Sequence, residues 1–420
     1  MSGFNQPGGG ATTAAGVSVN TAGGLVGPSV QTALQALHDA IGGTQKATGF
    51  LLVASNDAPA SVKAGADYVC DGVNDQVEIN AALVLAAPLQ TYNPLSPAGA
   101  AQRGVVMLTG GRFNIGGSIL MQTGTTLQGQ GRGTTEIRCV NITAATGAGA
   151  NLGAIKLAVA NGHMTTVKDF WLNGTFAAGM GGTAVHGIHY DMSGGTDTTD
   201  YPNTDPDSYH YINNLLINGF TTSTRHGIWL YASATANLRA AVIDAIDMRV
   251  SSGDGIRLET CSDSFVANCH VGGSGGSGYY INGGNTRMAN NKSFFSNTHG
   301  LWLVSGRCTV VGYETQDDFQ GIIIDGSPSV LTGLTIDTSS ASGLQVSSSK
   351  AVVGSFSIFN RGGGRYATTT LGLYFDATYT DLQIGPGNIE PASVTTPVSG
   401  AVGARSFAHW SDGTTQTATG

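Results

Sequence analysis

Two short runs, Gly300-Leu301-Trp302-Leu303 and Gly321-Ile322-Ile323-Ile324, share one pattern: glycine, apolar, any residue, apolar. The pattern recurs six more times along the chain, with its glycines at Gly187, Gly227, Gly255, Gly278, Gly343 and Gly372. The steps between the eight glycines are 40, 28, 23, 22, 21, 22 and 29 residues. Four consecutive steps of 21–23 residues indicate one structural unit per step, and the longer steps indicate units with loop insertions.

A second column of residues has nearly the same period. Its members are small or turn-forming, and its steps are 23, 21, 21 and 21 residues: Asn268, Asn291, Gly312, Gly333 and Gly354. Asparagine and glycine both tolerate positive φ, so this column predicts one left-handed turn residue per coil. Coils of about 22 residues with short strands and a repeated turn predict a β-solenoid.

Composition agrees with an all-β chain. Glycine accounts for 63 of 420 residues and charged residues for only 11%, which is typical of short strands joined by tight turns. The net charge of −8 and the lack of a basic run argue against a nucleic-acid partner. No stretch is apolar enough to insert into a membrane, and the polar first ten residues do not resemble a signal peptide.

The five cysteines indicate neither a disulfide framework nor a zinc site, because their number is odd and no CxxC occurs. We interpret them as small buried hydrophobic residues. The acidic insertion 191–210 is oxygen-rich enough to bind calcium, but its spacing fits no EF-hand, and we favour a solvated loop. We expect no metal and no cofactor.

The chain divides into four regions. Residues 1–48 are a Gly-rich segment with one short helix, 49–103 an opening module with a capping helix, 104–390 the repeats, and 391–420 a tail. The first helix follows Pro28-Ser29 and has an apolar stripe with 4-3-4 spacing: Val30, Leu34, Leu37 and Ile41. This spacing suits oligomerisation through a short coiled coil, although packing on its own domain explains the stripe equally well.

Three stretches resemble a known family. Residues 66–83, with Asp71-Gly72 and Asn74-Asp75, resemble the opening motif of pectate-lyase-like β-helices in phage tail proteins, with Asn74 in place of the first acid of the usual pair. Residues 104–113 and 125–131 resemble the first coil of that family. The segment around the first helix resembles one common ahead of tail-fibre domains.

The resemblance implies a right-handed parallel β-helix with a helical cap at its N-terminal end. It also implies a homotrimer in the virion tail, joined to other tail or baseplate proteins by its N-terminal segment. We expect Asp75 to cap a helix, and expect its Val77, Ala81 and Leu83–Leu85 side to close the open end of the solenoid. This role is structural, so we do not expect Asp71 or Asp75 to be catalytic.

Strand side chains alternate between the two faces of a sheet, so the variable residue of each repeat points outward. Stacked coils then place these residues in one column: His189, Trp229, Arg257, Tyr280, Trp302, Ile323, Gln345 and Tyr374. Four of the eight are Trp or Tyr, which suits an extended polysaccharide bound by ring stacking and hydrogen bonds. The same residues suit a subunit interface in a trimer, and both interpretations stay open.

Catalysis on this scaffold would need carboxyl groups or a base beside the bound sugar. The best candidates are Asp254 with Glu259 on one coil, and Asp317 with Asp318 in a later turn. Polygalacturonase relatives carry their motifs in another order, since Thr298-His299-Gly300 here precedes Gln316-Asp317-Asp318 and no R.K follows. We therefore do not carry that active site over.

The sequence favours an adhesive phage tail spike or fibre that recognises a host surface glycan. The alternatives are a depolymerase of the same glycan and a structural virion protein without a glycan ligand.

Overall fold

The computed structural model describes residues 50–87, 104–140, 142, 153–159, 162, 164–174, 185–191, 210–221, 224–232, 238–239, 241–401, 406–411 and 416–419. The expected first helix, with Val30, Leu34, Leu37 and Ile41, lies outside these residues. The same holds for nearly all of the 191–210 insertion.

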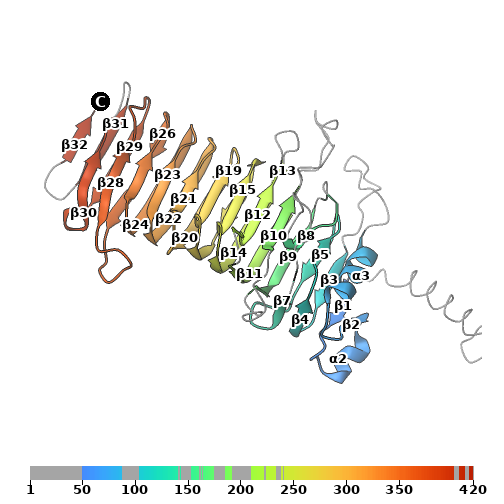
Figure 1. Ribbon diagram of the computed structural model, residues 1–420. Coiled ribbons are helices and arrows are strands. Elements are labelled where there is room, and N and C mark those ends of the chain that lie inside the picture. The colour runs from blue at the N-terminus through green and yellow to red at the C-terminus, as the bar shows by residue number, and fades with distance from the viewer. Residues whose placement is uncertain are drawn as a thin grey trace, which may run out of the picture. The chain divides into compact units, whose positions relative to one another are not determined.

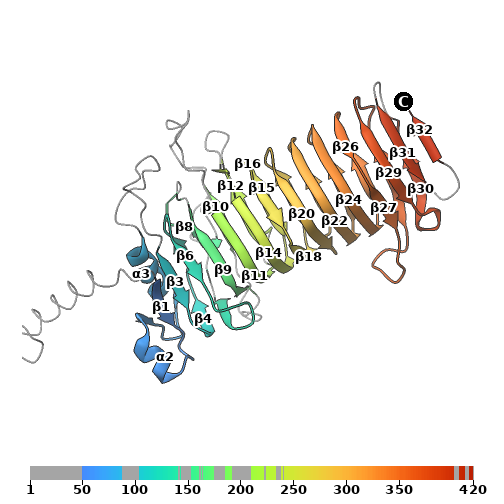
Figure 2. The ribbon, with the colours of Figure 1, turned by 180° about the vertical axis from the view of Figure 1, so that it is seen from behind.

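The described chain from Phe50 onward is a right-handed parallel β-helix, as predicted, with its coils stacked along one axis (Figures 1 and 2). One sheet has eleven parallel strands, one per coil. They are β5 (Ile119–Met121), β8 (Gly153–Leu157), β10 (His186–Asp191), β12 (Ile228–Tyr231), β15 (Ile256–Glu259), β19 (Tyr279–Asn282), β21 (His299–Leu303), β23 (Gln320–Ile324), β25 (Ser342–Val346), β28 (Thr369–Phe375) and β30 (Val394–Ser399).

The remaining strands form a nineteen-stranded sheet and one short pair, β13 (Leu238–Arg239) with β16 (Cys261–Ser262). The large sheet begins with β1 (Phe50–Ala54), β2 (Tyr68–Val69), β3 (Val105–Leu108), β4 (Gly111–Ile115), β6 (Thr126–Gln128), β7 (Thr135–Cys139), β9 (Thr166–Asn173), β11 (His210–Phe220), β14 (Ala241–Ser251) and β17 (Phe265–Ala267). It continues with β18 (His270–Ser274), β20 (Arg287–Phe294), β22 (Cys308–Asp318), β24 (Ser329–Ser339), β26 (Ala351–Val353), β27 (Phe356–Phe359), β29 (Gln383–Ile389), β31 (Phe407–Ser411) and β32 (Gln416–Thr419).

The interior is filled by the apolar positions of the repeat. Ile256 and Leu258, like Leu301 and Leu303 two coils later, are fully buried. Burial of each such side chain stabilises the fold by about 1.5–3 kcal/mol. All five cysteines are buried and free, as the sequence indicated, and burial raises the pKa of the Cys269 thiol to about 12.

A column of positive-φ residues bends the long strands of the large sheet once per coil. It consists of Asp169, Asn214, Ala245, Asn268, Asn290, Gly312 and Gly333. The predicted column is thus correct at three positions and wrong at Asn291 and Gly354, which do not have positive φ. Asn291 points inward instead, where it donates to the Val266 carbonyl and accepts from the Cys269 N–H.

The N-terminal end is capped by helix α3 (Gln76–Ala86), which packs on β1, β3 and β5 and is preceded by α2 (Ala60–Gly65) (Figure 1). The buried face of α3 consists of Ile79, Ala82 and Leu83. The predicted face was therefore largely wrong, because Val77, Val84 and Leu85 are 53–61% exposed.

Asp75 precedes α3 but does not cap it through its side chain. Its backbone is already helical, and its carboxylate accepts hydrogen bonds from the Gly72 N–H (2.8 Å) and the Asn114 N–H (2.6 Å). Asp75 therefore holds the preceding loop to β4.

The stacking of strands does not stop at residue 390. After a short 3-10 turn (Pro391–Ser393), β30 pairs in parallel with β28, and β31 pairs in parallel with β29. The last strand, β32, then returns antiparallel to β31. Residues predicted to form a tail therefore extend both sheets.

Candidate functional site

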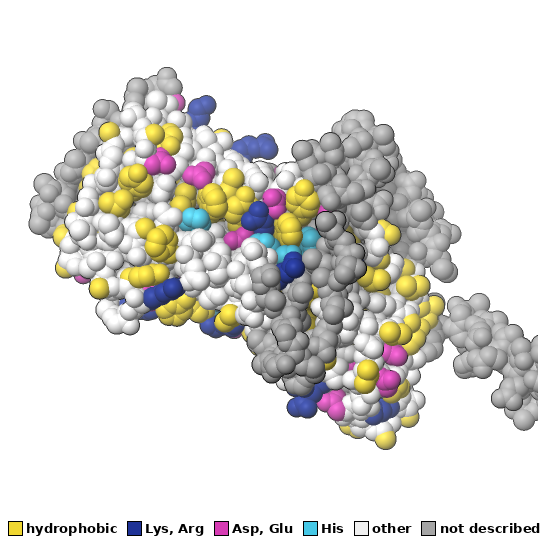
Figure 3. Space-filling model, in the orientation of Figure 1, with side chains coloured by type: hydrophobic (Ala, Val, Ile, Leu, Met, Phe, Trp, Pro, Cys, Tyr) yellow, Lys and Arg dark blue, Asp and Glu magenta, His cyan; other side chains and the backbone are white. Residues whose placement is uncertain are grey.

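The outward residues of the eleven-stranded sheet lie in register across eight coils. Each pairs with the next from His189 through Trp229, Arg257, Tyr280, Trp302, Ile323 and Gln345 to Tyr374. We call this set the outward column. Figure 3 shows hydrophobic, histidine, acidic and basic side chains gathered along this face of the coils.

At its N-terminal part, the outward column contains a cluster of rings. The His189 ring stacks on Trp229, with ring centroids 4.3 Å apart, and His186 stacks on His226 at 5.1 Å. His186, His189 and His226 are each less than 8% exposed. Burial lowers the pKa of His186 to about 2 and the pKa of His189 and His226 to about 4, so all three rings are neutral at pH 7.

Ion pairs join this cluster to the next coil. The Arg257 guanidinium donates to Asp254 (2.8 Å) and to Glu259 (2.9 Å), so it links the two candidate catalytic carboxylates. Asp254 also accepts from the Ser277 N–H (2.7 Å), and Glu259 accepts from the Trp229 indole N–H (3.1 Å). The sequence placed these acids on one coil, but it did not show that a single arginine bridges them.

The C-terminal part of the column has fewer ring contacts. The guanidinium carbon of Arg257 lies 3.9 Å from the centroid of the Tyr280 ring, and Trp302 is perpendicular to that ring at 5.2 Å. The Trp302 indole N–H donates to Asp325 (2.5 Å). Beyond it, Gln345 accepts from the Gln320 amide (3.2 Å).

Asp317 and Asp318 lie on β22 of the other sheet and have no access to solvent, being 1% and 0% exposed. Asp318 accepts from the Ser293 hydroxyl and the Ser296 N–H, both at 2.6 Å, and burial raises its pKa to about 6. Asp317 accepts from the Arg365 N–H (2.7 Å). Their contacts hold the coil interior and the 361–365 loop, so neither carboxylate reaches the outward column.

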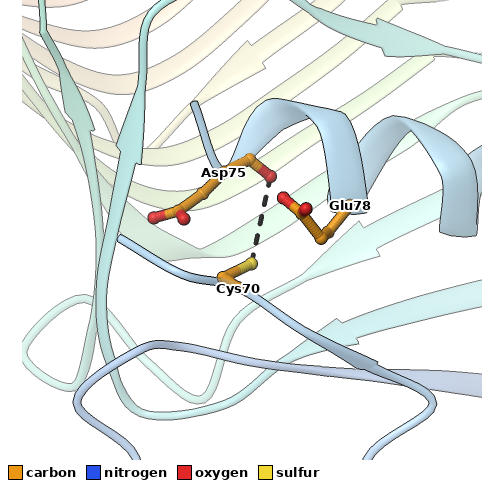
Figure 4. Close-up of side chains that lie close together, drawn as sticks. All are labelled: Cys70, Asp75 and Glu78. Atoms are coloured by element: carbon orange, nitrogen blue, oxygen red, sulfur yellow. Dashed lines mark hydrogen bonds between the residues drawn. The ribbon is translucent and has the colours of Figure 1, made fainter. Parts of the chain in front are cut away.

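One group of potential metal ligands occurs among the described residues: Cys70, Asp75 and Glu78, with donor atoms within 4.8 Å of one another. Figure 4 shows the Asp75 carboxylate directed away from the other two side chains, while its backbone carbonyl faces the Cys70 sulfur. Both carboxylate oxygens of Asp75 already accept backbone hydrogen bonds. Burial raises the pKa of the Cys70 thiol, which keeps it protonated, so these residues fit a hydrogen-bonded cap better than a metal site.

Comparison with known proteins agrees with the fold. A family model described as "Right handed beta helix region" matches residues 204–356. No curated protein matches the sequence. No helix among the described residues has the length and apolar character needed to cross a membrane.

Solved structures similar to the chain include the A-module of a mannuronan C-5 epimerase from Azotobacter vinelandii, at 14% identity and a TM-score of 0.46, covering 80% of this chain and 96% of the other. Another is the enzymatically active domain of tailspike protein 2 of bacteriophage CBA120, at 13% identity and a TM-score of 0.48; the match covers 78% of this chain and 49% of the tailspike chain. A third is a tailspike protein of an Acinetobacter baumannii bacteriophage, a capsular polysaccharide depolymerase, at 9% identity and a TM-score of 0.45, covering 82% and 59%.

Proposed function

We propose that this protein is an adhesive tail spike or tail fibre component of a phage virion that binds a host surface polysaccharide along the outward column. The register of that column is the observation that carries the proposal. Eight coils at a strand spacing of about 4.8 Å make a band roughly 34 Å long, which suits an extended chain of sugars. The resemblance of residues 66–83 and 104–131 to phage tail β-helices supports the assignment to the virion.

The column combines partly exposed rings with polar groups. Tyr280, Trp302 and Tyr374 are partly exposed, and amides, hydroxyls and carboxylates flank them. Such a surface can contact the apolar faces of sugars and hydrogen-bond their hydroxyls.

Binding suits the observed contacts better than hydrolysis. Asp254 and Glu259 both accept charge-assisted hydrogen bonds from Arg257. Glycoside hydrolysis needs one carboxyl group that donates a proton, whereas this arrangement uses both as acceptors. We therefore place depolymerase activity second.

A homotrimer is part of the proposal, and the nineteen-stranded sheet offers a separate surface for subunit contacts. Tyr211, Phe265, Val311 and Val330 point outward there and are 38–47% exposed. Apolar residues of this kind are enriched at the cores of subunit interfaces. With this face available, the outward column can stay free for a ligand.

The test is to incubate the purified protein with host-type envelope polysaccharides and to follow both binding and the release of new reducing or unsaturated ends. We expect binding without new ends. New ends that disappear in Asp254→Asn would establish a depolymerase instead. Neither binding nor cleavage across several envelopes would leave only a structural virion role.

A further inference from the structure

We infer that the glycan-binding part of the outward column is its C-terminal half, centred on Trp302, and that it accepts neutral rather than acidic sugars. This inference rests on the proposed function and specifies the ligand class and the ring on which the sugar stacks. It follows from ring geometry and from the distribution of charge.

Trp229, the tryptophan of the N-terminal half, lies between side chains of the two neighbouring coils. His189, in the coil before Trp229, stacks on that indole with an interplanar angle of 4°. Arg257, in the coil after it, lies 5.9 Å from the same ring and 3.9 Å from the ring of Tyr280. A ring packed between neighbouring coils presents only its edge to solvent, so Trp229 cannot stack on a sugar.

Trp302 has a different orientation. Tyr280 turns one face toward Arg257 in the preceding coil, and the Trp302 ring is at 89° to it. The Trp302 plane therefore does not stack along the coil axis. The indole also reaches both sides of the column, since its N–H donates to Asp325 while His299 lies 4.7 Å from its ring on the other side.

These contacts describe an indole lying across the sheet with one face toward solvent. The buried state of Ile323 agrees, because this residue points outward one coil after Trp302 and yet is only 6% exposed. Its neighbours in register are Trp302 in the preceding coil and Gln345 in the next. Trp302 itself stays partly exposed and so offers a platform for a sugar face.

The charged side chains near the C-terminal half of the column indicate which class of sugar it accepts. Among the outward positions described in β19, β21, β23, β25 and β28, no Lys or Arg occurs. Two carboxylates come directly after these strands: Asp325, which accepts from the Trp302 indole N–H, and Asp376, two residues after Tyr374. Carboxylates accept hydrogen bonds from sugar hydroxyls but repel the carboxylate of a uronic acid. The site thus suits hexoses and N-acetylhexosamines.

The experiment is calorimetric titration of the full chain with two panels of oligosaccharides of equal length, one neutral and one containing uronic acids. The variants are Trp302→Ala, Trp302→Phe and Asp325→Asn. Phe319→Ala, which removes an aromatic side chain that is 44% exposed outside the column, is the matched control. Thermal melting of each variant checks that it is folded.

We expect wild type to bind neutral oligosaccharides, Trp302→Ala to lose at least tenfold in affinity, and Trp302→Phe to recover part of that loss. Asp325→Asn should gain affinity for the uronic-acid panel, and Phe319→Ala should bind as wild type does. Unchanged affinity in Trp302→Ala, or wild-type preference for uronic acids, would overturn the inference and leave the proposed function standing. No binding by wild type to any envelope polysaccharide would overturn both.

Discussion

The outward column has two parts that use the same repeat differently. From His189 to Arg257 the side chains contact each other, with rings stacked coil on coil and both carboxylates paired with one guanidinium. From Trp302 to Tyr374 an isoleucine and a glutamine follow the tryptophan, and the side-chain contacts after Trp302 are hydrogen bonds, such as those of Gln345 with Gln320 and Asp376. The first part is packed like the core of a protein, and the second is the part that we propose binds the glycan.

The outward residues share one place in the repeat but differ in orientation and exposure. The reason is that each side chain packs against the side chains one coil before and after it. At a strand spacing of about 4.8 Å, two flat groups in adjacent coils stack and cover each other. A ring whose neighbour in the next coil is a smaller residue can instead lie flat over that residue. Substitutions that affect stability and binding separately can test this difference between the two parts.

Among single substitutions, the largest effect is expected for Asp254→Ala in the N-terminal part. This substitution removes the buried acceptor of Arg257 and of the Ser277 N–H, and should lower the free energy of unfolding by about 3 kcal/mol. Urea unfolding followed by circular dichroism measures it. Asp376→Ala is the control: it removes hydrogen bonds from Gln345, Ser347 and Tyr379 that are exposed to solvent, and should change stability by less than about 1 kcal/mol. Equal losses of unfolding free energy in the two variants would contradict the difference between the two parts of the column.

Replacing each tryptophan with alanine compares the two parts directly. Trp229→Ala loses the stack on His189 and the hydrogen bond to Glu259, and should cost about 2–3 kcal/mol of stability. Trp302→Ala loses a hydrogen bond to Asp325 and fewer ring contacts, and should cost about 1 kcal/mol. Urea unfolding of both variants measures the two losses of stability. A larger loss of stability in Trp302→Ala than in Trp229→Ala would contradict the structural role of the first part.

Acid should destabilise the N-terminal part. His186, His189 and His226 have pKa values lowered by burial from 6.5 to about 2, 4 and 4. The unfolded chain therefore binds more protons below pH 6.5, so stability is complete above that pH and falls toward pH 4. Each histidine contributes a loss of about 1.4 kcal/mol per pH unit in this window. His189→Phe should keep the ring stack and make the decline shallower, and an unchanged slope would argue against a buried neutral His189.

The smallest effect concerns a turn beside the same part. Val250 has a φ of 58° and is 49% exposed, a backbone conformation that costs a β-branched residue free energy. Val250→Gly should therefore raise the free energy of unfolding, by about 0.5–1 kcal/mol. Gly273, the next residue along in that turn column, already has positive φ, and Gly273→Val should destabilise by a similar amount. Changes of opposite sign in the free energy of unfolding, measured by urea unfolding of the two variants, would support backbone strain at Val250.

The coil could be predicted from the amino-acid sequence. The spacing of glycines and the alternation around them predicted the strands, their inward apolar faces and the register of the outward column, because these depend on local periodicity. The sequence also predicted a helical cap, but it did not predict which face of the helix is buried, since Val77 is exposed and Ile79 is buried. This short helix has apolar residues on several sides, so the strands that it covers decide which of them are buried.

The contacts of the outward and turn residues became visible only in the three-dimensional structure. It assigned the left-handed turn to Asn290 rather than its neighbour Asn291, buried Asp317 and Asp318, and joined Asp254 to Glu259 through Arg257. It also separated Trp229 from Trp302, two residues with the same place in the repeat. The physical reason is that ring orientation, burial and pairing depend on side chains one coil away, some 20 to 40 residues distant in the chain, and no local pattern specifies those contacts.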